Sequence, residues 1–137
     1  MTCLRGASAF DSVLKRHGGA PVSVFAIWHP ILATDRLGPA RWALNTLPDR
    51  RVRQYWDAER LVASRMIADA RPPQPELECC RRDDTIWDVA AVYRPGDTWT
   101  DKLPTAVVFN GSVADIASEI DAAIAASSQP QPEKTVQ

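Results

Sequence analysis

The stretch PVSVFAIWHPILATDRLGPARWALNTL, residues 21–47, decides the fold because an apolar strand is followed here by a turn and an amphipathic helix. Residues 22–28 are rich in β-branched and aromatic side chains and are apolar on both faces except at Ser23. This pattern is typical of a central strand that helices cover on both sides. Because Pro30 cannot donate a backbone hydrogen bond, we expect the strand to end near His29.

A helix and a second strand are expected directly after this first strand. Pro39 suits the first turn of a helix with four residues on the side that faces the sheet: Trp42, Ala43, Thr46 and Leu47. Residues 51–56 alternate between basic or polar and larger side chains, which predicts a second strand. A strand, a helix and a strand in this order predict a parallel pair joined by a right-handed crossover.

A further helix is predicted over residues 58–70, with Asp57 as its N-cap. Arg65 and Asp69 are expected at the solvent-exposed edge of this helix. Residues 71–84 contain three prolines, a pair of cysteines and a pair of arginines, which together favour a surface loop.

Two strands and two helices complete the expected fold. Residues 86–93 and 105–109 are β-rich and flank a turn signal, so they are predicted to pair antiparallel. The clearest amphipathic helix begins at Ser112, with Asp115 at the capping-box position. A short amphipathic helix is also predicted near the N-terminus, over residues 8–16.

Composition limits the classes of partner. Sixteen basic and seventeen acidic residues leave a net charge of −1, so we expect no nucleic acid and no membrane as partners. The local cluster of Arg50, Arg51 and Arg53 is interpreted as a solvated entrance to the second strand. Three cysteines are too few for a disulfide scaffold, which favours the cytoplasm. We expect one domain over residues 1–126 and a disordered tail over 127–137.

The expected order of elements resembles that of the thioredoxin-like superfamily. Residues 10–28, FDSVLKRHGGAPVSVFAIW, are similar in spacing and type to the helix and first central strand that precede the thioredoxin active site. Trp28 lies where the family's W-C-x-x-C motif begins, but the next residues are His29, Pro30, Ile31 and Leu32. The chain is thus similar to a divergent member without the CxxC motif, and ordinary disulfide reductase activity is not expected.

The resemblance implies an α/β fold of the thioredoxin-like type. This fold is a three-layer sandwich, with an N-terminal helix and then βαβ-α-ββα around a central four-stranded mixed sheet. It implies a binding cleft around Trp28, His29 and Pro30, at the end of the first strand. Asp35, in the loop that follows, would either cap the next helix or orient His29.

The adjacent cysteines Cys79 and Cys80 are the main candidates for chemistry. Neighbouring Cα atoms lie about 3.8 Å apart, less than the usual disulfide span of about 4.4 Å or more, so a bond between them would be easily reduced. Two adjacent thiolates also suit soft metal or metalloid ions, and Arg81 and Arg82 would favour the thiolate form. The alternative is that both cysteines simply pack as small apolar residues.

Two hypotheses of different classes follow from these residues. In the first, Cys79 and Cys80 carry thiol redox chemistry or bind a soft ion, with His29 as a third ligand or a proton donor, and the partner is a protein thiol or the ion itself. In the second, the chain is a non-catalytic module that binds a protein or peptide in the cleft. No cofactor is predicted, and the oligomeric state stays open.

Overall fold

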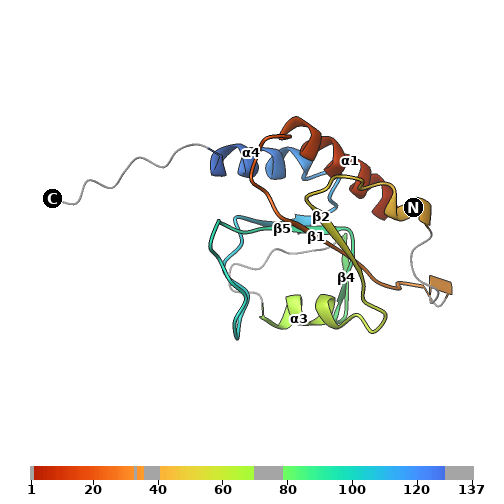
Figure 1. Cartoon of the computed structure of the whole chain (residues 1–137). Helices are drawn as coiled ribbons and strands as arrows, with labels where there is room; N and C mark the ends of the chain where they lie inside the picture. Colours follow the sequence, from red (N-terminus) through yellow and green to blue (C-terminus); the bar gives the residue numbers. More distant parts are fainter. Residues whose placement is uncertain (1, 33, 36–40, 70–78, 129–137) are drawn as a thin grey trace.

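The computed structural model describes residues 2–32, 34, 35, 41–69 and 79–128. The helices are α1 (Thr2–Arg16), α2 (Arg41–Leu44), α3 (Leu61–Asp69) and α4 (Ala117–Ser127). The strands are β1 (Val24–Trp28), β2 (Val52–Trp56), β3 (Arg81–Arg82), β4 (Thr85–Ile86), β5 (Val89–Val92) and β6 (Val108–Gly111). In Figure 1, α1 and α4 lie on one side of the strands and α3 lies on the other.

The prediction of a central four-stranded mixed sheet is wrong. The described strands form three separate two-stranded sheets: β1 and β2 pair parallel, while β3 with β4 and β5 with β6 pair antiparallel. One reason lies at Asp88, whose φ of 51° is in the left-handed region. A strand cannot continue through that conformation, so the predicted strand over residues 86–93 is divided into β4 and β5.

One face of the parallel sheet β1–β2 carries exposed aromatic side chains. Partners in a parallel pair share a face, so Phe25, Ile27, Arg53 and Tyr55 all lie on the same side. Phe25 and Tyr55 on that side are 59% and 48% exposed, and their rings stack with centroids 6.4 Å apart. The expectation that helices cover both faces of this strand is therefore wrong, because none of the described helices shields Phe25 and Tyr55 from solvent.

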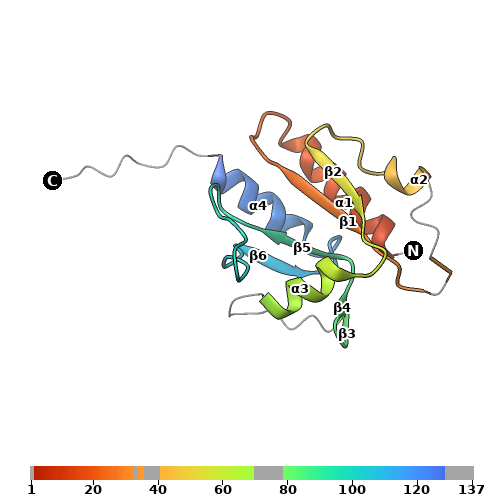
Figure 2. The same cartoon turned by 60° about the horizontal axis from the view of Figure 1, so that its bottom comes forward.

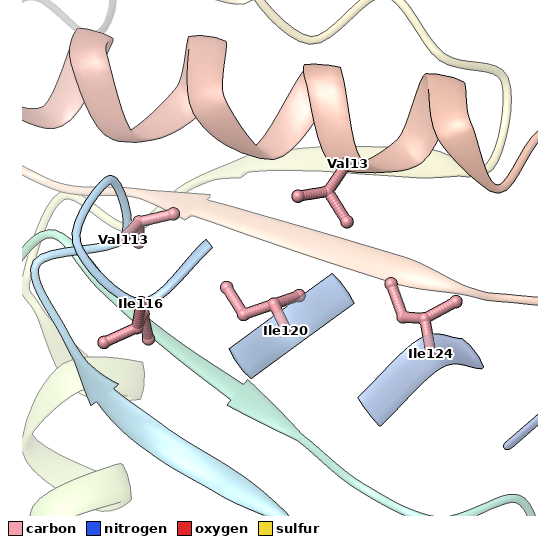
Figure 3. Close-up of a cluster of buried hydrophobic side chains, with 5 residues drawn as sticks. All are labelled: Val13, Val113, Ile116, Ile120 and Ile124. Atoms are coloured by element: carbon pink, nitrogen blue, oxygen red, sulfur yellow. The ribbon is translucent and has the colours of Figure 1, made fainter. Parts of the chain in front are cut away.

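The antiparallel sheet β5–β6, in contrast, has a packed cluster on each face. On the α1–α4 side, Val92 and Val108 pack against a cluster of buried side chains: Val13, Val113, Ile116, Ile120 and Ile124. Figure 3 shows Val13 of α1 pointing toward Ile120 and Ile124 of α4. On the opposite side, Val89 and Phe109 pack against Ala63 of α3 and Ile86 of β4. Figure 2 shows α3 lying over this pair of strands.

Arg51 links the start of β2 to the end of α1. Its guanidinium donates hydrogen bonds to three backbone oxygens, those of Leu14 at 2.8 Å, His17 at 2.6 Å and Ala20 at 3.2 Å. It also forms an ion pair with Asp49 at 2.6 Å. The C-terminal carbonyls of a helix have no partners within the helix, and a cation satisfies them well. Arg51 is thus a structural cap, and its interpretation as part of a solvated entrance is wrong.

The predicted caps of two other helices differ in detail from the structure. Asp57 accepts a hydrogen bond from the backbone N–H of Val62 at 2.7 Å, although α3 begins only at Leu61. At α4, Ser112 donates to the carboxylate of Asp115 at 2.7 Å, and Ile116 occupies the N-cap position without a side-chain cap. The first turn after β6 is therefore not yet part of the helix.

Asp69 was predicted to lie at a solvent-exposed edge, but the structure buries it, with only 3% of the residue exposed. Its carboxylate forms an ion pair with Arg65 at 2.7 Å and accepts a hydrogen bond from the indole N–H of Trp99 at 3.2 Å. These two bonds offset the cost of burying the charge.

Several predictions fall outside the described residues: Pro39 at the helix start, the side chain of Trp42, most of the loop 71–84, and the tail from residue 129.

Candidate functional site

Cys79 and Cys80 form a disulfide between neighbouring residues at the entrance to the β3–β4 hairpin, with their Cα atoms 3.8 Å apart. The two residues lie in different surroundings. Cys79 is exposed, whereas Cys80 is only 2% exposed. A single disulfide therefore presents one accessible and one inaccessible half-cystine.

Gly111, the last residue of β6, provides the space that Cys80 occupies. A Cβ atom at Gly111 would lie 2.9 Å from the Sγ of Cys80 and 2.8 Å from the backbone oxygen of Asp88. Real Cβ contacts are essentially never that short, so a side chain at this position would force the neighbours apart. Nothing in the local sequence pattern around Gly111 indicates that a sulfur atom packs against it.

Backbone hydrogen bonds hold the buried half of the pair in place. The carbonyl of Cys80 accepts a hydrogen bond from the N–H of Trp87 at 3.0 Å, which extends the β3–β4 ladder by one pair. The carbonyl of Asp88 in turn accepts a hydrogen bond from Val113 at 3.1 Å. Cys80 is therefore bonded to Trp87, and the next residue along the chain, Asp88, is bonded to the turn that follows β6.

Asp88 connects the cysteine hairpin to α1. Its carboxylate lies against Gly6, where an added Cβ would be only 3.3 Å from the carboxyl carbon. Burial raises the pKa of Asp88, with a smaller contribution from the charge of Asp115, while the N–H of Val113 and the charge of Arg5 act in the opposite direction. The local sequence around Asp88 does not reveal this role, because the position of the carboxylate depends on contacts between distant segments.

His29 binds the backbone of the hairpin rather than the sulfur atoms. Its Nε2 lies 2.8 Å from the carbonyl oxygen of Ile86, and since a carbonyl can only accept, the imidazole donates. Ile86 is paired with Arg81, the residue after Cys80, so His29 approaches the strand opposite the cysteines. Within the described ranges, no group of three or more His, Cys, Asp or Glu residues could hold a metal ion. The three-ligand set of Cys79, Cys80 and His29 is not assembled.

The other predicted cleft residues have structural partners. The indole N–H of Trp28 donates to the side-chain oxygen of Gln54 at 2.9 Å, and Gln54 donates onward to the carbonyl of Leu44 in α2. Trp28 is therefore directed toward the covered face of β1–β2, while His29 is directed toward the hairpin. Pro30, at the exit of β1, is partly buried.

Asp35 organises its own loop. Its Oδ2 accepts hydrogen bonds from the backbone N–H groups of Ile31 at 3.1 Å and Leu32 at 2.8 Å. These bonds, that from Leu32 first, lower the pKa of Asp35 below its ordinary value. The predicted roles were a helix cap and a partner of His29, whereas the observed bonds hold the turn that follows β1.

Comparisons with protein-family models, with curated proteins and with solved structures found no match. The inference of function therefore rests on the geometry of the chain itself. None of the helices in the described part of the chain has the length and apolar character needed to cross a bilayer.

Chemically, the hairpin presents a disulfide that a second thiol can approach from one side. Thiol–disulfide exchange proceeds by attack of a thiolate on one sulfur, so access to that sulfur controls the reaction. Arg81 and Arg82, both exposed, follow the pair directly. Positive charge near a sulfur atom favours its thiolate form once the bond is broken.

Proposed function

We propose that the protein is a thiol redox protein in which Cys79 and Cys80 cycle between a disulfide and a dithiol. The observation that carries the proposal is the bonded pair itself, with Cys79 exposed and Cys80 held against Gly111. A disulfide between adjacent residues closes a minimal loop and so contributes little to stability by restricting the unfolded chain. A role in chemistry accounts for the pair better than a role as a staple.

The reaction is a two-electron exchange. Reduction adds two electrons and two protons to the disulfide and yields two thiols, while the donor, a dithiol or two monothiols, becomes a disulfide. The reduced pair also places two soft ligands at one point, so it should chelate a trivalent arsenical. A cytoplasmic location remains a prediction that fits a reducible pair.

Intact-mass measurement with thiol alkylation tests the proposal. We expect the native protein to gain two daltons on mild reduction, to take up two additional alkyl groups, and to lose both again after mild oxidation. The reduced protein should bind one phenylarsine oxide per chain. The variant with both Cys79→Ser and Cys80→Ser should do none of these, while the matched control Cys3→Ser should behave as the wild type.

Cysteines that remain unreactive until the protein unfolds, with no arsenical adduct, would contradict the redox proposal. In that case the non-catalytic binding module becomes the leading hypothesis. Its predicted residues, Trp28, His29 and Pro30, would then be tested by substitution against peptide binding.

A further inference from the structure

We propose that the two sulfur atoms have different and fixed roles: an incoming thiolate attacks Cys79, and Cys80 leaves as the sheltered thiol. This inference rests on the proposed redox function and assigns the substrate class, which is a molecule with a free thiol. The source of that thiol is either a small molecule or an exposed cysteine of a protein. Both have the same reacting group, and the experiment below distinguishes them.

The two cysteines differ in how far an external thiolate can approach them. In thiol–disulfide exchange the attacking sulfur approaches along the line of the S–S bond, from the side opposite the leaving sulfur. Attack on Cys80 would need space beside a residue that is 2% exposed. Even a single carbon atom on Gly111 would come within 2.9 Å of the Cys80 sulfur, so an external thiolate cannot enter there. Cys79, in contrast, is exposed.

The second step is the balance of the reaction. The external thiolate forms a new S–S bond with Cys79, and the electron pair of the Cys79–Cys80 bond moves to the sulfur of Cys80. The product is a mixed disulfide on Cys79 and a thiolate at Cys80. Burial disfavours a charged thiolate, so Cys80 takes up a proton from water and becomes a neutral thiol.

The third step is the fate of the mixed disulfide. If Cys80 loses its proton again, its thiolate can attack Cys79, expel the external thiol and restore the original bond. If a second external thiolate attacks the external sulfur first, the external disulfide leaves and the reduced pair remains. Cys80 is therefore the resolving cysteine, and a variant that lacks its sulfur should accumulate the mixed disulfide on Cys79.

Single-cysteine variants test the assignment. In a Cys3→Ser background, Cys80→Ala leaves only Cys79, and Cys79→Ala leaves only Cys80. We expect the Cys79 protein to react with Ellman's reagent and with oxidised glutathione about as fast as an exposed thiol does. The Cys80 protein should react at least about tenfold more slowly, because labelling needs a local opening of the hairpin. Circular dichroism and thermal unfolding establish that both variants are folded.

A measurement on the unsubstituted chain covers the case in which a variant fails to fold. The native disulfide is treated with excess glutathione or with a folded protein that has one exposed cysteine, then quenched with acid and sequenced by mass spectrometry. We expect the adduct on Cys79 with at least one of the two thiols, and their relative rates identify the preferred source. An adduct mainly on Cys80, or equal labelling of the two single-cysteine variants, overturns the assignment.

These results separate the two proposals. If the native protein cycles between disulfide and dithiol but the adduct lies on Cys80, the redox function stands and only the assignment fails. If the native disulfide does not react with any thiol while the pair is folded, the redox function itself fails.

Discussion

The side of the molecule formed by α1 and α4 and the end formed by the cysteine hairpin differ in how they are held together. On the helical side, Val13 and Ile120 are completely buried, and Arg51 satisfies the carbonyls at the end of α1. The hairpin consists of two strands of two residues each, and one of them, Arg81–Arg82, is exposed. The helical side is therefore the more deeply buried of the two regions, and the proposed thiol chemistry lies at the other, in the hairpin.

The largest effect is expected from Ile120→Ala, in the cluster between α1 and α4. The side chain is 0% exposed, so its truncation leaves a cavity and should lower the free energy of unfolding by about 2–5 kcal/mol. The reaction rate of Cys79 with glutathione should not change. Urea unfolding measures the first quantity, and Ala122→Ser on the exposed side of α4 is the control. A large change in Cys79 reactivity would mean that the two regions are coupled.

A smaller loss is expected when Arg51 is replaced by alanine. This change removes hydrogen bonds to the carbonyls of Leu14 and His17 and the ion pair with Asp49, which should cost about 1–3 kcal/mol of unfolding free energy. Arg50→Ala, at an exposed neighbouring position, is the matched control in urea unfolding. Equal stabilities of the two variants would show that Arg51 does not act as a cap.

Gly111→Ala, beside the hairpin, should change the reactivity of the cysteines more than it changes the packing of α1 and α4. The added methyl group would lie 2.9 Å from the Cys80 sulfur and 2.8 Å from a backbone oxygen, and such overpacking costs about 1–3 kcal/mol. In the protein with Cys80 as its only cysteine, labelling should become roughly tenfold faster, because local opening becomes easier. The control is Gly19→Ala, at a position where an added Cβ meets nothing within 4 Å. Unchanged labelling would show that Gly111 does not shelter Cys80.

The smallest expected effect is the pH dependence of stability that arises from Asp49, the ion-pair partner of Arg51. Hydrogen bonds from the Arg51 side chain, followed by its backbone N–H, lower the pKa of Asp49 from 3.8 to about 2. The unfolded chain binds this proton more readily than the folded one, so stability rises with pH in this range. The contribution of Asp49 is complete well above pH 3.8 and is lost as the pH falls through about 2.

Urea unfolding between pH 2 and pH 6, comparing the wild type with Asp49→Asn, measures this contribution. The difference in unfolding free energy should be constant above about pH 5 and shrink toward pH 2. A difference that stays the same at all pH values would contradict the assignment to the charge of Asp49.

Local patterns in the sequence predicted the individual elements better than their assembly. The strands near residues 22–28 and 51–56 and their parallel pairing are confirmed, because apolar and β-branched runs have a strong local signal. The four-stranded sheet was wrong because pairing between β1 and the later strands depends on long-range contacts. The break at Asp88 could not be predicted from the local pattern, since Asp88 has a positive φ and contacts Gly6 and Val113, which are distant from it in sequence.

In the candidate site, too, some features have a local signal in the sequence and others depend on long-range contacts. The rarity of adjacent cysteines was enough to single out Cys79 and Cys80. The difference in burial between them, and the role of Gly111 in that difference, arise from a contact between residues some thirty positions apart. His29 was placed correctly near the end of β1, but its binding to Ile86 depends on where the hairpin packs.

Hydrogen exchange of the oxidised and reduced forms tests most directly whether chemistry and stability are separate in this molecule. The account predicts that reduction lowers protection in residues 80–89 and 109–113, the segments that contain Trp87 and Gly111 beside Cys80, while α1 and α4 keep theirs. Loss of protection throughout α1 and α4, or no change in the hairpin, would contradict it.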